Sequence, residues 1–312
     1  MKAISLISIM LLATSVFAET PVSGTVSGTW TKEGSPYHVT GNLTVAKASE
    51  LWVNPGVDVV FEGPYSLTVE GALVAGKEKG IHLRMKDNPP VKFTTDLEKN
   101  SAGWAGIKFV NARDDNALVN CTVEHVRTTG DGGGIRSDHS EISLTNCMLS
   151  DCSTDGAGGG VAMLGGEVSL TNCTIENCRA GGQGGAIYGA NAQMTLTNCT
   201  IRNNTGSAGG ALYLTKSELV STNDTYEGNS VGGISLVAKS EGVITNSTLT
   251  GSGIACNQSQ LVATNIHIES GDETALSCLE HSEAVITNAA LKGKKGLDKD
   301  ESSQVVATNV EE

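Results

Sequence analysis

One short phrase recurs along this chain at a nearly constant spacing. It reads SLTNCMLSDC at 143–152, SLTNCTIENC at 169–178 and TLTNCTIRNN at 195–204. Its asparagine returns every 19 to 26 residues, at Asn120, Asn146, Asn172, Asn198, Asn223, Asn246, Asn265, Asn288 and Asn309. A period in the twenties, held over this many copies, is typical of a solenoid in which each repeat stacks on the one before it.

A second phrase, rich in glycine, precedes most copies of the first. It reads GGGIRS at 132–137, GGGVAM at 158–163, GGAIYG at 184–189, GGALYL at 209–214 and GGISLV at 232–237. The segments between these phrases alternate apolar and polar residues, as in 167–170, and are too short and too rich in Thr and Gly for helices. The sequence therefore predicts an all-β fold, a right-handed parallel β-helix of about 10–11 coils, with about 4.8 Å between coils.

The recurring asparagine has a structural interpretation. Asn tolerates the left-handed backbone conformation better than any residue but Gly, so we expect it at a sharp bend between two strands. Stacked Asn side chains then hydrogen-bond from coil to coil, and we expect them to satisfy polar groups at a buried corner. The Thr before each ladder Asn, from Thr145 to Thr308, forms a second column. Ice-binding solenoids present such hydroxyl columns, but a Thr ladder at a strand edge is the simpler interpretation.

The eight cysteines fall into vertical columns of the same repeat. Cys121, Cys147, Cys173 and Cys199 each follow a ladder Asn, Cys152 and Cys178 share a position five residues later, and Cys256 and Cys278 align with each other. Neighbours in a column lie close enough for a disulfide. They equally suit a buried stack of thiols, and both interpretations stay open. A thiolate column gives poor tetrahedral geometry, so we expect no metal site there.

The first residues, MKAISLISIMLLATSVFAET, combine a basic start, an apolar stretch and small residues before Glu19. This pattern predicts a signal peptide over residues 1–18 and an exported protein, located in the periplasm, at the cell surface or outside the cell. No other run approaches the roughly 18 apolar residues of a membrane-spanning helix, so we expect no transmembrane segment. We expect a leader or N-terminal cap over residues 19–40 and a single β-helix domain over 41–312. The net charge of −13 argues against a nucleic-acid partner.

One cluster of residues offers chemistry. Asp131, Arg136, Asp138 and His139 lie in TGDGGGIRSDHS, and Asp155 follows one coil later. Carboxylates with His and Arg nearby can supply acid–base catalysis or calcium-assisted proton abstraction, and calcium is the one cofactor that this cluster would use. The alternative is that turns of a β-solenoid require Asp, Ser and Gly for backbone reasons.

The two phrases resemble known repeats. GGAIYG and GGALYL, with TIENC or TIRNN nearby, resemble the GGA[ILV] and FxxN repeats of polymorphic outer-membrane autotransporter passengers, although Ile175 and Ile201 replace the Phe of FxxN. The wider pattern resembles right-handed parallel β-helix proteins of the pectin-lyase-like class. We recognise no C-terminal autotransporter barrel after Asn309. The resemblance, over about residues 40–310, implies a fold but not a substrate.

Two functions remain open from the sequence. The first is a non-enzymatic, exported β-helix of the cell envelope, adhesin-like, whose long faces contact a polysaccharide or a cell-surface protein. The second is a polysaccharide lyase or glycoside hydrolase with its acidic site near residues 131–155.

Overall fold

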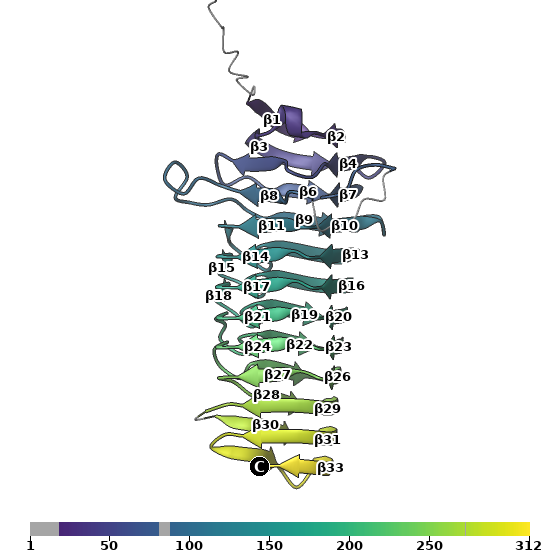
Figure 1. Cartoon of the computed structure of the whole chain (residues 1–312), viewed down its shortest axis with the longest axis vertical. Coiled ribbons are helices and arrows are strands. Elements are labelled where there is room, and N and C mark those ends of the chain that lie inside the picture. Colours follow the sequence, from purple (N-terminus) through teal and green to yellow (C-terminus); the bar gives the residue numbers. More distant parts are fainter. Residues whose placement is uncertain (1–18, 81–87, 272) are drawn as a thin grey trace, which may run out of the picture.

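The computed structural model describes residues 19–80, 88–271 and 273–312, so the expected signal peptide lies outside the described residues. The strands stack into one column of about 12 coils (Figure 1), against the ten or eleven expected. The difference arises at the N-terminal end. Residues 20–30, which we expected to belong to a leader or cap, pair in parallel register with the coil that follows them.

Each coil contributes strands to three faces of the column. Face 1 contains the second half of β3 (Tyr37–Val45), then β6 (Leu67–Val69), β9 (Ile107–Val110), the first halves of β13 (Ile135–Thr145) and β16 (Val161–Thr171), β19 (Ile187–Ala190), β22 (Leu212–Thr215), β25 (Ile234–Val237), β28 (Ile254–Asn257), β30 (Thr274–Leu279) and β32 (Lys295–Lys299). Face 2 contains β2 (Gly28–Trp30), β4 (Glu50–Val53), β7 (Ala72–Ala75), β10 (Asn116–Val119), the second halves of β13 and β16, β20 (Gln193–Thr197), β23 (Glu218–Thr222), β26 (Glu241–Thr245) and the first halves of β29 (Gln260–Glu269), β31 (Glu283–Lys292) and β33 (Gln304–Glu311). Face 3 contains the first half of β1 (Thr20–Thr25), whose end pairs on face 1 instead, the first half of β3, β5 (Asp58–Phe61), β8 (Val91–Thr94), β11 (Cys121–Glu124), β14 (Met148–Ser150), β17 (Thr174–Glu176), β21 (Thr200–Arg202), β24 (Thr225–Glu227), β27 (Thr248–Thr250) and the second halves of β29, β31 and β33.

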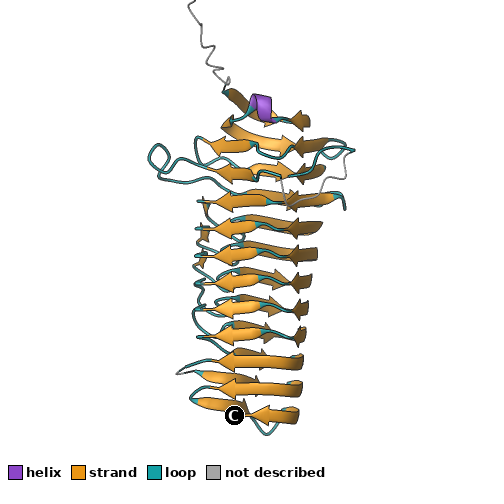
Figure 2. Ribbon diagram, viewed as in Figure 1, coloured by secondary structure: helices purple, strands orange, loops and turns teal. Residues whose placement is uncertain are grey.

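The core forms because equivalent residues of successive coils point inward together. Ile135, Val161 and Ile187 occupy one register position in three consecutive coils, and all three are fully buried. Near the N-terminal end the stack includes aromatic rings, with the Phe61 and Trp104 centroids 4.0 Å apart. Helix is limited, among the described residues, to one 3-10 turn, Lys32–Gly34 (Figure 2). The predicted all-β solenoid is confirmed.

The asparagine ladder is confirmed as a hydrogen-bonded column. All nine ladder residues have φ between 51° and 58°, the left-handed conformation expected at the bend between faces 2 and 3. The Nδ2 of Asn172 donates to Oδ1 of Asn146 over 3.1 Å, and the pattern continues to Asn309, which donates to Asn288 over 3.0 Å.

Our expectation of a buried corner for this ladder is wrong, because most of its side chains are exposed. Asn146, Asn172 and Asn198 all point to solvent, whereas the cysteine that follows each of them is buried. The left-handed bend turns the Asn side chain outward and the next side chain inward, so the ladder runs along the outside of the corner.

The cysteine columns are present, and all eight cysteines are buried free thiols in the structure. The Sγ of Cys173 donates to the carbonyl oxygen of Leu144 over 3.5 Å, and Cys199 makes the equivalent contact to Leu170. Cys256 and Cys278 are register partners on face 1. Of the two interpretations that the sequence left open, the structure has the thiol stack.

Three internal polar columns were not anticipated. At the bend between faces 1 and 2, Ser217, Ser240, Ser259, Ser282 and Ser303 stack, and each hydroxyl oxygen accepts the backbone N–H of the equivalent residue one coil earlier. Asn204 and Asn229 continue the second cysteine column in the two coils after Cys178. Asn204 Oδ1 accepts the backbone N–H of Cys178, and Asn229 Oδ1 accepts from Nδ2 of Asn204 over 3.0 Å. Asp224 and Ser247 continue the first cysteine column, the one that runs from Cys121 to Cys199, in the two coils after Cys199. These columns satisfy backbone amides that would otherwise be buried without a partner.

Candidate functional site

A short fourth strand appears in three consecutive coils and forms the floor of an open groove. These strands are β12 (Arg127–Thr128), β15 (Ser153–Thr154) and β18 (Arg179–Ala180), which pair in parallel as a separate sheet. In Figure 1, β15 and β18 lie at the edge of the column beside β14 and β17. Among the described residues this short sheet is confined to coils before Asn204, which accounts for the longer sequence period there.

Local sequence positions each short strand in the same way. The strand of face 3 is followed at once by a residue in the left-handed conformation: His125, Asp151 or Asn177, with φ between 52° and 60°. The next residue, Val126, Cys152 or Cys178, is fully buried and anchors the turn in the core. The residues after it then face outward and line the groove. The second cysteine column therefore lies directly beneath the groove.

The glycine phrase serves the loop that returns from the groove to face 1. A Cβ atom built on Gly159 would lie 2.3 Å from the carbonyl oxygen of Gly185 in the next coil. Gly158, just before it, has φ of 72°. Backbone therefore stacks directly on backbone in this loop, and no side chain fits between the coils.

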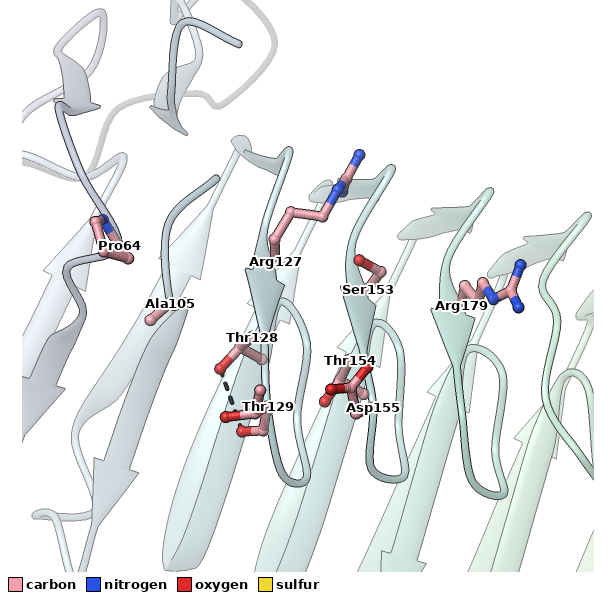
Figure 3. Close-up of a pocket in the computed structure, with 9 residues that line it drawn as sticks. All are labelled: Pro64, Ala105, Arg127, Thr128, Thr129, Ser153, Thr154, Asp155 and Arg179. Atoms are coloured by element: carbon pink, nitrogen blue, oxygen red, sulfur yellow. Dashed lines mark hydrogen bonds between the residues drawn. The ribbon is translucent and has the colours of Figure 1, made fainter. Parts of the chain in front are cut away.

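The groove has a volume of about 500 Å³, and most of the residues that line it have polar side chains (Figure 3). Its described lining residues are Pro64, Ala105, Arg127, Thr128, Thr129, Ser153, Thr154, Asp155 and Arg179. Four of them carry hydroxyl groups, two carry guanidinium groups, and Asp155 is the one carboxylate among them. Such a surface offers hydrogen-bonding groups beside apolar side-chain carbons.

The two arginines occupy equivalent positions two coils apart. Arg127 pairs in register with Ser153, and Ser153 pairs with Arg179. Their backbones are therefore separated by about 9.6 Å along the column, twice the spacing of neighbouring strands. Arg127 donates through one terminal nitrogen to the carbonyl oxygens of Val126 and Asp151. Arg179 is exposed and has no carboxylate or hydrogen-bond partner for its side chain in the described part of the chain.

The structure does not assemble the sequence-predicted cluster into one site. Asp155 lies in the groove. Asp131 lies in the returning loop, where its Oδ1 accepts the backbone N–H of Ala157 over 2.9 Å. Asp138 lies on the outside of face 1, where both carboxylate oxygens are 3.0 Å from Nε of Arg136. Asp131 therefore stabilises a turn, and Asp138 and Arg136 stabilise each other.

His139 lies at the far end of face 1, at the bend toward face 2. It is exposed, has φ of 47°, and its ring packs against Gly165 of the next coil. On the same face, partial burial and the neighbouring Arg136 lower the pKa of Lys108. Tyr188 and Tyr213 also lie there, with ring centroids 6.1 Å apart and an interplanar angle of 11°.

A smaller cavity near the N-terminal end was missed by sequence reasoning. It has a volume of about 320 Å³ and is lined by His38, Val60, Phe61, Glu62, Asp96, Lys99 and Asn100. Nδ1 of His38 lies 2.8 Å from Oε1 of Glu62, and Nε2 of His38 is buried with no hydrogen-bond partner. The 24-residue spacing of His38 and Glu62, close to one coil, was the available signal.

No metal site is evident in the part of the chain that the structure describes. Within residues 19–80, 88–271 and 273–312, no group of three His, Cys, Asp or Glu side chains is arranged to hold an ion. The same ranges contain no helix long and apolar enough to cross a membrane.

Comparison with known proteins gives one structural similarity and no match among curated sequences. The solved structure is the catalytic unit of a thermostable GH87 alpha-1,3-glucanase from Streptomyces thermodiastaticus strain HF3-3. It is 13% identical in sequence, with a TM-score of 0.39, and the alignment covers 86% of this chain. The alignment spans 64% of the glucanase unit, less than two thirds of its length.

A family model also matches the sequence over residues 79–249, more than half of its length. The matched segment contains the three short strands of the groove, the returning glycine loops and most of the asparagine ladder. The family is described as the right-handed β-helix region, in agreement with the fold, and the chain belongs to it.

Proposed function

We propose that this chain is an exported, non-enzymatic β-helix protein that binds an anionic polysaccharide in the groove over β12, β15 and β18. The observation that carries the proposal is the pair Arg127 and Arg179, two coils apart in a polar, open groove with Ser153 between them. Export rests on the sequence of residues 1–18.

The groove chemistry favours a polyanionic sugar chain. A guanidinium group binds a carboxylate or sulfate through two parallel hydrogen bonds. Arg179 has no carboxylate partner among the described residues, so its guanidinium group is available to a ligand. The four hydroxyl-bearing lining residues suit the hydroxyl groups of the sugar rings. A polymer with acidic groups recurring at about 9.6 Å along the column would reach both arginines.

The net charge of −13 does not prevent this contact. At physiological ionic strength, exposed charges more than about 8 Å away are largely screened. The charged lining residues are two arginines and one aspartate, so the groove itself is locally cationic.

The same groove argues for binding rather than cleavage. Most glycoside hydrolases need a pair of carboxylates flanking the scissile bond. Asp155 is the one carboxylate among the described lining residues, and Asp131 and Asp138 are engaged in contacts of their own. The hydrolase alternative therefore lacks a second acidic group among the described lining residues of this groove.

The test uses purified residues 19–312 and immobilised polygalacturonate, alginate, dextran sulfate and neutral dextran. We expect binding to the anionic polymers, weakened by salt. The double variant R127A/R179A should bind about ten-fold to a hundred-fold more weakly, since charge-assisted hydrogen bonds are lost. The control is R202A, which removes an exposed arginine that pairs with Glu176 on face 3, outside the groove.

Two outcomes would overturn the proposal. One is equal binding by the wild type and R127A/R179A. The other is release of new reducing ends or unsaturated products from any of these polymers, abolished in D155N, which would establish the enzymatic alternative.

A further inference from the structure

The exposed apolar side chains of the described chain gather on face 2 toward the C-terminal end. Five stacked valines are 42–61% exposed: Val220, Val243, Val262, Val285 and Val306. They are register partners in five consecutive coils, so they form one continuous stripe. Only two other large apolar residues are exposed in the described ranges, Met148 and Val231, and neither belongs to this stripe.

Each valine lies between two polar columns on the same strand. Two residues before it is an acidic or amide residue: Glu218, Glu241, Gln260, Glu283 or Gln304. Two residues after it is a threonine: Thr222, Thr245, Thr264, Thr287 or Thr308. The exposed asparagine ladder follows the threonines. Three earlier coils continue the pattern with Ser143, Ser169 and Thr195 in place of valine.

We propose that this outward surface of face 2 is a self-association surface, through which two copies of the chain pair side by side with their columns parallel. A two-fold axis parallel to the column places the valine stripe of one copy on the valine stripe of the other. It also places the glutamate column of each copy opposite the threonines and ladder asparagines of its partner. Apolar surface is then buried at the centre, and acceptors meet donors at both edges.

The acceptors and donors at those edges are available. Glu218, Glu241 and Glu283 form no ion pair within the described ranges, and the threonine hydroxyls form no hydrogen bond there. In the five valine coils the ladder amides of Asn223, Asn246, Asn265, Asn288 and Asn309 each donate one hydrogen bond within the column, and within the described ranges their second N–H has no acceptor. The opposite arrangement, with antiparallel columns, would place glutamate on glutamate, and like charges that face each other repel.

The repeat itself selects a second copy as the partner. The Glu/Gln–Val–Thr pattern recurs once per coil at about 4.8 Å, so a partner must carry the same repeat to match every coil. An identical chain does so in each coil at once. Eight coils of about 38 Å by a strand width of about 13–17 Å bury about 1,000–1,300 Å² in total. This area is at the lower limit for a specific interface, so we expect a weak, reversible dimer.

Sedimentation velocity of residues 19–312 over a wide concentration range tests the proposal. We expect a reversible monomer–dimer equilibrium whose dissociation constant rises at least about ten-fold in V262E, since a charge is placed at the centre of the apolar stripe. M148E is the matched control because Met148 is exposed on face 3. A wild type that stays monomeric throughout, or equal loss of the dimer in both variants, overturns the proposal.

Cross-linking tests the arrangement without adding charge. The native cysteines are all buried, so an introduced surface thiol reacts selectively. With a short bis-maleimide, V262C alone should cross-link, and a mixture of E241C and T245C should cross-link better than either variant alone. If E241C alone or T245C alone cross-links as well as the mixture does, the parallel arrangement is overturned. R127A/R179A should dimerise as the wild type does, which separates this proposal from the groove.

Discussion

Asn198 Nδ2 donates a hydrogen bond of 3.2 Å to Oδ1 of Asn172, one coil earlier, while its own backbone holds φ of 55°. One residue therefore supplies both the bend and the contact between coils. We expect Asn198→Ala to lower the free energy of unfolding by about 1–3 kcal/mol. The loss combines the cost of a left-handed alanine with the lost hydrogen bonds, which are weak at an exposed site. Chemical denaturation followed by circular dichroism measures it.

Asn198→Gly separates the two contributions. Glycine adopts the left-handed conformation freely, so only the side-chain hydrogen bonds and some unfolded-state entropy are lost. The expected destabilisation is smaller than for alanine. If glycine destabilises the protein as much as alanine does, the bend conformation is not what the asparagine stabilises.

The close stacking of the glycine loop predicts a strong steric effect. In Gly159→Ala the new methyl group would meet the Gly185 carbonyl oxygen at 2.3 Å, and backbone must move to relieve the contact. We expect a loss of about 1–3 kcal/mol or more, as for other overpacking changes. Gly182→Ala is the control from the same loop of the next coil, since its nearest contact would be 3.1 Å. Comparable melting temperatures for the two variants would contradict the argument.

Asp224 predicts an acid-dependent stability. It is buried, its Oδ1 accepts the backbone N–H of Cys199 and its Oδ2 accepts the hydroxyl of Ser221 over 2.7 Å. Removal from water raises its pKa. The folded chain therefore holds this proton more tightly than the unfolded chain, so this residue's contribution to stability is present at pH 4 or below and is lost as the pH rises through the folded-state pKa.

Asp224→Asn removes that titration while keeping the shape of the side chain. We expect the variant to gain stability relative to the wild type at pH 7 and the difference to shrink at pH 4. Denaturation curves at both pH values measure it, with Asp151→Asn, at an exposed bend, as the control. A variant that is less stable than the wild type at pH 7 would show that the carboxylate is preferred there.

The thiol stack predicts a loss of stability at alkaline pH. The hydrogen bond with Cys147 is the main cause that raises the pKa of Cys173 to about 12, and burial adds to it. Between the unfolded-state value near 8.5 and that value, the unfolded chain loses a proton that the folded chain keeps. Stability should then fall by about 1.4 kcal/mol per pH unit from this one group.

Cys173→Ala should flatten the fall in stability between pH 9 and pH 11. In the folded wild type at pH 8, we expect thiol reagents to label the eight buried cysteines only after denaturant is added. Rapid labelling without denaturant, or an unchanged pH dependence in Cys173→Ala, would contradict a neutral, buried stack.

Much of the scaffold was predictable because every coil of a solenoid repeats the same local backbone conformation. Asn146 and Asn172 mark equivalent bends, and Cys147 and Cys173 had to fall in one buried column once the period was known. The serine column starting at Ser217 and the internal pair Asn204 and Asn229 carry the same period and could have been found. They were missed because Ser and Asn are also ordinary turn residues, so composition does not separate an inward hydroxyl from an exposed one.

The sequence alone determined the period, the parallel stacking and the order of inward and outward residues, since these follow from local alternation and from repetition. It did not determine which bends turn a side chain outward, as the exposed Asn ladder shows. Nor did the sequence indicate that Arg127 and Arg179 line one groove. It suggested a single cluster for Asp131 and Asp138, which the structure separates. Those relationships depend on how the coils are wound and where the short fourth strand forms. They are set by packing between residues far apart in the chain, which only the tertiary structure decides.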